Sequence, residues 1–219
     1  MRRFICATFA LACAVACAAP ARAETAPALF TGYVAFMSNY IGRGLAQSVG
    51  QPSVQAELDY NNSGGGFYAG LDGTSINWID QVYPGDSVAV ELDGYAGYRK
   101  LAGDWTFKAG VLRLQFPGRY VAQSPPAARP DTTELFASAA WRNLSAKLNY
   151  SVTDAFGTPD SRGSWYLDLA AELPIAGHWR VGAHLGRKQS RGTNPATGVP
   201  NSRSSYTDYR LAATYLFDA

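Results

Sequence analysis

The chain has 219 residues, of which 47% are hydrophobic and 16% charged. No stretch of it supplies the ~18 consecutive apolar residues that a membrane-spanning helix needs, so a helical membrane protein is excluded. The formal net charge of +2 depends on the N-terminal residues Arg2, Arg3 and Arg22. Without them 16 basic residues face 17 acidic ones, so the charge balance gives no reason to expect a nucleic-acid partner.

Residues 1–23 have the pattern of an export signal. The segment begins with Met-Arg-Arg, continues with small apolar residues and ends at A-R-A, residues 21–23. All three cysteines, Cys6, Cys13 and Cys17, lie within it, so the exported chain from Glu24 contains no thiol. A lipidated cysteine is the weaker alternative, because A-L-A and A-V-A are poor lipidation boxes. We predict a signal peptide over 1–23 and a single domain over 24–219.

The rest of the chain divides into strands of about ten residues whose connectors are alternately long and short. The short connectors are 61–66, 100–104, 142–144 and 174–178, and the long ones are 41–51, 77–86, 117–131, 155–163 and 189–205. Each short connector contains Gly, Asn or Pro, as tight turns do. This order predicts an up-and-down meander of about ten strands, with both chain ends on the short-turn side.

Apolar and polar residues alternate clearly in five of the expected strands and less regularly in the others, 30–40, 67–76, 105–116, 132–141 and 206–217. Residues 54–60 read V-Q-A-E-L-D-Y, and the same period of two recurs at 88–93, 146–153, 165–173 and 179–185. Near Val111 and Leu112 the apolar residues change parity, which indicates a bulge or a register error. Alternation alone also fits a soluble, lipocalin-like barrel with its apolar face inward.

The positions of the aromatic residues favour a membrane barrel. Those beside the short turns are Tyr60, Phe67, Tyr98, Trp105, Trp141, Trp179 and Phe217, and those beside the long loops are Tyr40, Trp78, Phe116, Phe156, Trp165 and Tyr206. Two aromatic belts at opposite strand ends are typical of the two membrane interfaces. We therefore predict an all-β, transmembrane antiparallel up-and-down barrel in a bacterial outer membrane, reached through the periplasm. Lipid requires the barrel to close, because open sheet edges leave backbone groups unpaired.

The polar face of the strands, predicted to line the barrel lumen, carries charges of both signs. The candidate lumen-lining residues are Glu57, Asp59, Asp72, Glu91, Asp93, Lys108, Lys147, Asp168, Glu172 and Arg180, with Glu134 and Lys188 on the same face. These charges either line an aqueous pore or pair across a plugged lumen, and a barrel of this size favours filling. Inward glycines such as Gly70, Gly97 and Gly110 leave space for a narrow passage, so both alternatives stay open.

One connector stands apart from the others. Residues 38–48 read S-N-Y-I-G-R-G-L-A-Q-S, where Gly42 and Gly44 add no side-chain bulk beside Arg43. Arg43 is expected either to fold into the barrel mouth and pair with a lumen carboxylate, or to remain an exposed loop residue.

Signatures of an enzyme are weak. The chain has two histidines, His178 and His184, and neither belongs to a G-x-S-x-G or metal-spaced motif. We expect His184 to form hydrogen bonds in the lumen, and we expect no catalytic activity, metal or cofactor.

Several motifs in a shared order make the chain similar to the TorF family of proposed porins, also called Gcw_chp. They are S-N-Y-I-G-R-G-L-A-Q-S (38–48), P-S-V-Q (52–55), G-F-Y-A-G (66–70), E-L-D-G-Y-A-G-Y (91–98), F-P-G (116–118), T-E-L-F-A-S (133–138), Y-S-V-T-D-A-F-G (150–157) and Y-T-D-Y (206–209). The resemblance implies an outer-membrane protein of proteobacterial type, with no catalytic or substrate residues to carry over.

The C-terminus departs from the pattern of this family. Members usually continue through a further hairpin to a terminal Phe, whereas here Phe217 is third from the end. Either the barrel closes with ten strands or the last pair is missing, and twelve strands are then expected in an intact member.

Together these features predict a narrow passive channel for small hydrophilic solutes. The alternative is a non-conducting structural or interaction barrel whose long loops, especially 117–131 and 189–205, bind a ligand outside the cell. The expected partners are outer-membrane lipids, the barrel-assembly machinery and small solutes. The sequence indicates neither the solute nor the oligomeric state.

Overall fold

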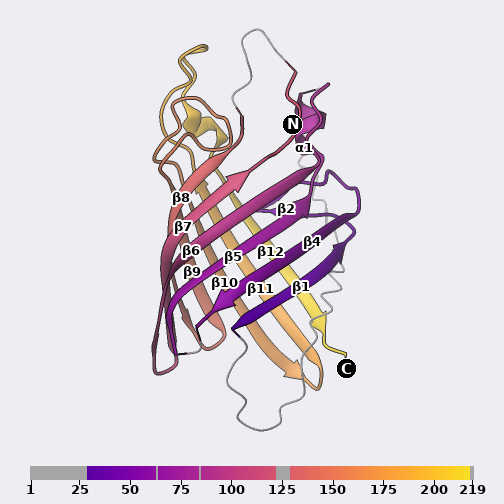
Figure 1. Ribbon diagram of the computed structural model, residues 1–219, viewed down its shortest axis with the longest axis vertical. Coiled ribbons are helices and arrows are strands. Elements are labelled where there is room, and N and C mark those ends of the chain that lie inside the picture. Colours follow the sequence, from indigo (N-terminus) through magenta and orange to yellow (C-terminus); the bar gives the residue numbers. More distant parts are fainter. Residues whose placement is uncertain (1–28, 63, 84, 122–128, 218–219) are drawn as a thin grey trace.

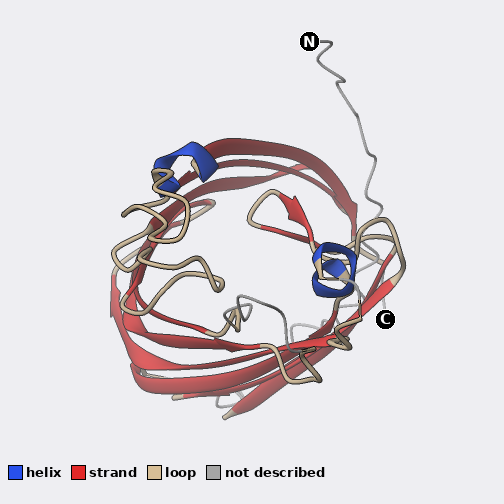
Figure 2. Cartoon of the chain, turned by 90° about the horizontal axis from the view of Figure 1, so that it is seen from above, coloured by secondary structure: helices blue, strands red, loops and turns tan. Residues whose placement is uncertain are grey.

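The computed structural model describes residues 29–62, 64–83, 85–121 and 129–217, so the predicted signal and its cysteines lie outside the described residues. The main feature is one ten-stranded antiparallel sheet in which each strand pairs with its neighbours in sequence. This arrangement confirms the predicted all-β meander. The sheet curls around a central space, and the long connectors gather at one end of it (Figures 1 and 2).

The bounds of the elements follow the predicted segments closely. The large sheet contains β1 (Phe30–Met37), β4 (Ser53–Asn61), β5 (Gly66–Ser75), β6 (Val90–Ala102), β7 (Trp105–Gln115), β8 (Thr132–Trp141), β9 (Leu144–Ser151), β10 (Trp165–Ala176), β11 (Trp179–Gln189) and β12 (Tyr206–Tyr215). The long connectors contain a small hairpin of β2 (Ile41–Gly42) and β3 (Leu45–Ala46), and two short helices, α1 (Trp78–Val82) and η1 (Asn201–Ser204). Neither helix in the described residues has the length and apolar character needed to cross a membrane.

Tight turns account for the short-turn end of the sheet. Gly103 and Gly177 have φ angles of +60° and +54°, which a two-residue turn between antiparallel strands requires and glycine adopts without strain. Arg142 takes a similar conformation, with φ of +50°, between β8 and β9. The strands β1 and β12 form the two edges of the sheet, and no backbone pairing joins them within the ranges that the structure describes.

The two faces of the sheet differ in chemistry. Apolar side chains such as Leu58 and Leu71 are exposed on the outer face, at 55% and 66%, while their neighbours Glu57 and Asp72 face the concave side. The register of β7 runs without interruption against both β6 and β8, so the strand contains no bulge at Val111 and Leu112. The apolar residues themselves change face there, because Val111 is exposed on the outer face while Leu112 and Leu114 are buried on the inner one.

The parity change in β7 has its cause at the mouth of the sheet. Inward-facing Leu112 and Leu114 belong to a small apolar cluster with Ile79 of α1 and with Phe116, which we call the mouth core. Ile79 is fully buried and Phe116 is 1% exposed. Since this core covers the inner face near the long loops, apolar residues are favourable on that face there.

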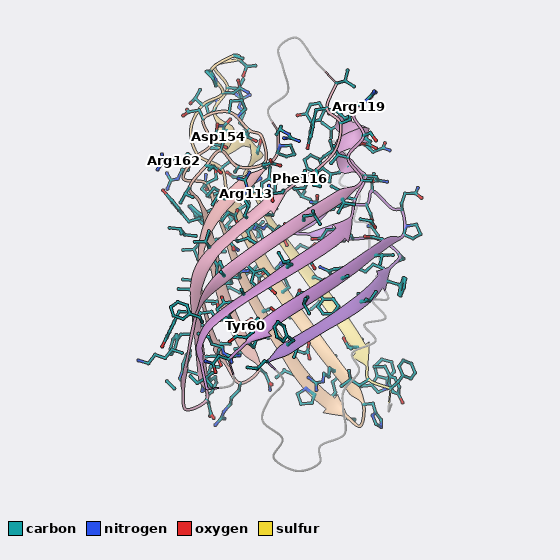
Figure 3. The ribbon with its side chains drawn as sticks, viewed as in Figure 1. Tyr60, Arg113, Phe116, Arg119, Asp154 and Arg162 are labelled. Carbon is teal, nitrogen blue, oxygen red and sulfur yellow. The ribbon has the colours of Figure 1, made fainter. Side chains whose placement is uncertain are left out.

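The short-turn end carries the predicted aromatic belt. Exposed rings pair across neighbouring strands, as in Phe30–Tyr60, Phe67–Tyr98 and Trp179–Tyr215, with centroids 5.4, 5.5 and 5.1 Å apart. Figure 3 shows Tyr60 at this end and Phe116 near the opposite one. Such aromatic pairs stabilise adjacent strands.

The second predicted belt, beside the long loops, is wrong in most of its members. Phe116, Trp78, Tyr40 and Phe156 pack in or against the mouth core, because the connectors fold over the end of the sheet and bury their rings. Tyr206 also points inward, where its hydroxyl binds the Arg43 carbonyl. Exposed rings elsewhere on the outer face include those of Phe36, Tyr150 and Tyr209.

Candidate functional site: a charged interior

The predicted lumen-lining residues share the concave face of the sheet. The pairing registers place Glu57, Asp72 and Asp93 opposite one another on β4, β5 and β6. On the far side of the ring, Lys147 of β9 lies opposite Asp168 of β10. The alternation of side chains along each strand therefore brings acidic and basic groups from distant segments into one interior space.

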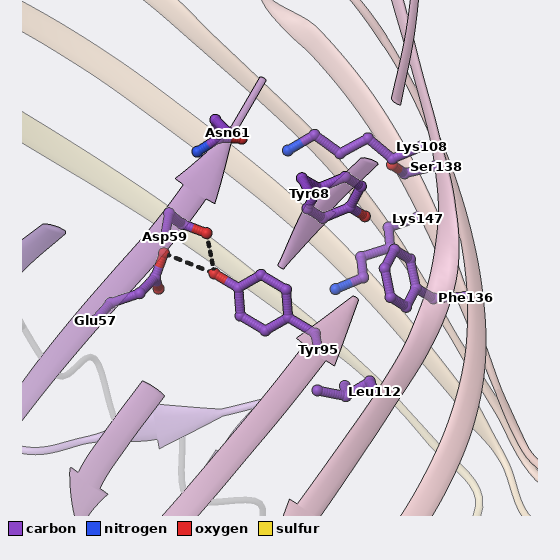
Figure 4. Close-up of a pocket in the computed structure, with 10 residues that line it drawn as sticks. All are labelled: Glu57, Asp59, Asn61, Tyr68, Tyr95, Lys108, Leu112, Phe136, Ser138 and Lys147. Atoms are coloured by element: carbon purple, nitrogen blue, oxygen red, sulfur yellow. Dashed lines mark hydrogen bonds between the residues drawn. The ribbon is translucent and has the colours of Figure 1, made fainter. Parts of the chain in front are cut away.

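A cavity of about 350 Å³ occupies the half of this interior nearer the short turns. Its lining residues are Glu57, Asp59, Asn61, Tyr68, Tyr95, Lys108, Leu112, Phe136, Ser138 and Lys147. Figure 4 shows the carboxylates on one side, with the Lys108 and Lys147 amino groups pointing in from the other. We call this space the interior cavity.

The acidic side of the interior cavity is organised by Tyr95 of β6. Its hydroxyl lies 2.5 Å from Asp59 Oδ1 and 3.1 Å from Glu57 Oε1 (Figure 4). A second tyrosine, Tyr33 of β1, donates to Glu57 Oε2 at 3.2 Å. A Cβ on Gly70 of β5 would overlap the Tyr95 ring, so this glycine provides the room that the ring needs.

The basic side consists of lysines held over aromatic rings. Lys108 Nζ lies 5.1 Å from the Tyr68 ring centroid, and Lys147 Nζ lies 4.9 Å from that of Phe136. These are cation–π distances. Ser138 is the direct cross-strand neighbour of both lysines and separates them on β8.

The inward glycines Gly70, Gly97 and Gly110 do not leave the open space that the sequence suggested. Gly97 and Gly110 are paired across β6 and β7, and a Cβ on either would crowd an adjacent backbone as well as an aromatic ring. The ring is Tyr68 at Gly97 and Phe136 at Gly110. Aromatic side chains thus cover these glycines and form part of the cavity wall.

The β2–β3 hairpin lies inside the ring of strands (Figure 2). At its tip, the Arg43 guanidinium donates to both carboxylate oxygens of Glu134 on β8, at 2.8 and 2.6 Å. Burial lowers the pKa of Arg43, but the hydrogen bonds and negative charge of Glu134 outweigh burial and raise that pKa above its ordinary value. The structure therefore places Arg43 on an interior carboxylate, which was one of the two expected arrangements.

Further contacts hold the hairpin across the interior. Arg43 has a φ of +49°, and its guanidinium lies 5.5 Å from the ring centroids of both Phe156 and Tyr166. Tyr206 of β12 donates to the Arg43 carbonyl at 2.8 Å. At its base, the Gln47 carbonyl accepts backbone hydrogen bonds from Asn77 and Trp78. The hairpin is consequently tied to β8, β12 and the start of α1.

A row of carboxylates lines the interior beneath this hairpin. Asp72 accepts hydrogen bonds from Gln55 and Thr74, both at 2.8 Å, whereas Asp93 Oδ1 is buried without a hydrogen-bond partner among the described residues. Glu91 is 6% exposed. Asp72 and Asp93 lie directly opposite each other on neighbouring strands, where like charges repel, so one wall of the interior is crowded with acidic groups.

His184 of β11 occupies a second polar cluster. Its Nε2 lies 2.8 Å from Asp208 and its Nδ1 lies 3.3 Å from Asp168, while the Tyr166 hydroxyl donates to Asp208 at 3.1 Å. His184 therefore serves as an interior hydrogen-bonding residue. No group of three or more potential metal ligands with suitable geometry occurs in the part of the chain described.

Glu172 and Arg180 lie on the same face but do not line the interior cavity. They form an exposed ion pair of 3.0 Å across β10 and β11, close to the short turn. The residues that the sequence reasoning missed are mainly the rings, Tyr68, Tyr95 and Phe136. The sequence did contain a signal for them, because each ring lies an even number of positions from a polar residue of its own strand and so shares the inward face.

The geometry defines a class of protein: an antiparallel meander curled around a charged interior, with apolar side chains on its outer face. The chain belongs to the Gcw_chp family, described as bacterial protein of unknown function, whose model matches residues 21–219. No curated protein and no solved structure matches the chain.

Proposed function

We propose that the exported chain forms a transmembrane β-barrel in a bacterial outer membrane and acts as a narrow passive channel for small hydrophilic solutes. One observation carries the proposal, namely that the polarity of the sheet is the inverse of a soluble barrel. Leucines such as Leu58, Leu71 and Leu211 are exposed outside, whereas carboxylates and lysines line the inside. Lipid against the outer face accounts for the exposed leucines, and water in the interior accounts for the charged lining.

Closure of the barrel is part of this proposal. An edge strand in lipid leaves its N–H and C=O groups unpaired at a cost of several kcal/mol each. The outer edges of β1 and β12 must therefore pair in the membrane, and the barrel-assembly machinery is the expected partner for insertion. The belt of paired rings beside the short turns suits a membrane interface and supports this placement.

The expected passage is narrow. The β2–β3 hairpin crosses the half of the interior nearer the long loops, and the remaining half holds a cavity of about 350 Å³. Wide water-filled channels belong to barrels of sixteen or more strands. Small polar solutes are thus the fitting cargo.

Planar-bilayer recording of the purified protein tests the channel. We expect small, steady unitary currents in symmetrical salt, and larger ones when Arg43→Gln and Glu134→Gln together release the hairpin. A parent protein and a released variant that both lack current would remove the channel proposal.

The second candidate is a non-conducting structural or interaction barrel. The specific observation in its favour is the double hydrogen bond between Arg43 and Glu134, with Glu134 only 2% exposed, because such a buried pair suits a permanent plug. In this alternative the long loops carry the function. The same recordings separate the two candidates.

A further inference from the structure

The interior cavity presents charges of opposite sign on two facing sides, and these charges form no ion pairs with other described residues. Within the described residues, no cationic side chain lies within ion-pair distance of Glu57 or Asp59. Likewise, no carboxylate of the described residues lies within that distance of the Lys108 or Lys147 amino group. Each side therefore lacks an ion-pair partner in direct contact, which a bound molecule can supply.

The acidic side is short of hydrogen-bond donors. The Tyr95 hydroxyl contacts both Asp59 and Glu57, but a hydroxyl has one hydrogen and serves one acceptor at a time. Tyr33 adds one more donor, to Glu57. An ammonium group has three donors and no acceptor, so it fits the remaining oxygen positions.

The basic side is prepared for an anion in the same way. Lys108 and Lys147 rest over the rings of Tyr68 and Phe136, and Figure 4 shows both amino groups directed into the cavity. The Ser138 side chain lies between them and can donate a further hydrogen bond. Groups held in place before binding lose less conformational entropy on binding.

We propose that the interior cavity binds a small zwitterion carrying one ammonium and one carboxylate group, of the size of an amino acid or dipeptide. The proposal rests on the channel function and names its solute class. The ammonium lies at Glu57 and Asp59, and the carboxylate at Lys108 and Lys147. A volume of about 350 Å³ falls in the usual range of small-molecule sites, about 300–1,000 Å³.

The remaining lining residues suit the middle of such a molecule. Leu112 and Phe136 add apolar surface to the cavity lining, against which an aliphatic segment can lie. A neutral sugar leaves both sets of charges without partners, and a singly charged molecule leaves one set. The zwitterion should therefore bind more tightly than any of these.

Calorimetric titration of the full chain in detergent tests the site with glycylglycine. The comparison ligands are N-acetylglycylglycine, which lacks the ammonium, glycylglycinamide, which lacks the carboxylate, and xylose, which is neutral. We expect glycylglycine to bind with a Kd roughly tenfold or more below that of each comparison ligand. Equal affinities for glycylglycine and either single-charge analogue would overturn the proposal.

Two double variants assign the ends of the ligand. Glu57→Gln with Asp59→Asn should abolish the preference for glycylglycine over its N-acetyl derivative, and Lys108→Met with Lys147→Met should abolish the preference over the amide. The matched control is Glu172→Gln with Arg180→Met, which removes one exposed ion pair of the same face outside the cavity. Loss of binding in this control, with the fold intact by circular dichroism, would contradict the assignment.

Liposome swelling separates failure of the site from failure of the channel. Swelling in xylose without any preference for glycylglycine in the titration would leave the channel and remove the zwitterion site. Tight glycylglycine binding without swelling in any solute would support the site and remove the channel.

Discussion

The guanidinium of Arg43 forms two hydrogen bonds, of 2.8 and 2.6 Å, with the carboxylate of Glu134, a residue 91 positions away in the sequence. This pair joins a connector to the far wall of the ring of strands. It thereby determines how much of the interior the β2–β3 hairpin occupies. In the proposed channel, the hairpin and the interior cavity below it together limit which solutes can pass.

Breaking the Arg43–Glu134 pair from one side should destabilise the protein. Either Arg43→Gln or Glu134→Gln alone should lower the free energy of unfolding by about 3–5 kcal/mol, because the remaining charge is buried without its partner. The double variant should lose less than the sum of the two. Denaturant titration in detergent measures these values. Arg142→Gln is the control, since its pair with Asp104 is 64% and 55% exposed and worth about 0–1 kcal/mol.

The tip of the hairpin should be sensitive to a single methyl group. Gly44 and Gly50 both have positive φ angles, +78° and +75°, so alanine carries a similar backbone strain at either position. A Cβ on Gly44 would also overlap the Asp208 side chain, whereas one on Gly50 would meet no atom within 4 Å. Gly44→Ala should therefore lower the thermal unfolding midpoint more than Gly50→Ala. Similar midpoints for the two variants would contradict the packing of the hairpin against β12.

Membrane placement predicts a difference between the two faces of β4. Leu58→Arg should cost roughly 2–4 kcal/mol in a lipid-folding assay, because it sets a charge against hydrocarbon. Gln55→Arg faces inward beside Asp72, to which Gln55 donates at 2.8 Å, and should be tolerated. Equal tolerance at both positions would argue against a lipid-facing outer surface.

The carboxylate row should set the charge preference of the channel. Replacing Glu91→Gln and Asp93→Asn should shift the reversal potential in a salt gradient toward zero, because negative groups along a pore attract cations. Stability should hold, since the register sets Asp93 directly opposite Asp72 and its removal relieves a repulsion. Asp104→Asn, at an exposed short turn, is the matched control. An unchanged reversal potential in a conducting variant would show that the row lies off the ion path.

The local alternation of the sequence was enough to predict the strands and, where it is regular, their two faces. Side chains alternate with a period of two, so Leu58 and Glu57 had to lie on opposite faces whatever the rest of the chain did. Turn residues such as Gly103 and Gly177 likewise marked the short connectors. A tight turn is a local structure, so its residue preferences can be recognised without knowing the rest of the fold.

Contacts between distant segments could not be predicted in this way. Leu112 and Phe116 turn inward because α1 covers that end of the sheet, and this burial also removes most of the second aromatic belt. The Tyr95 ring from the next strand packs against Gly70, and Arg43 binds Glu134 although several other carboxylates face the interior. The sequence by itself therefore determined the meander and its two-sided chemistry. Only the tertiary structure decided how the interior is filled, because that depends on which side chains meet across the ring.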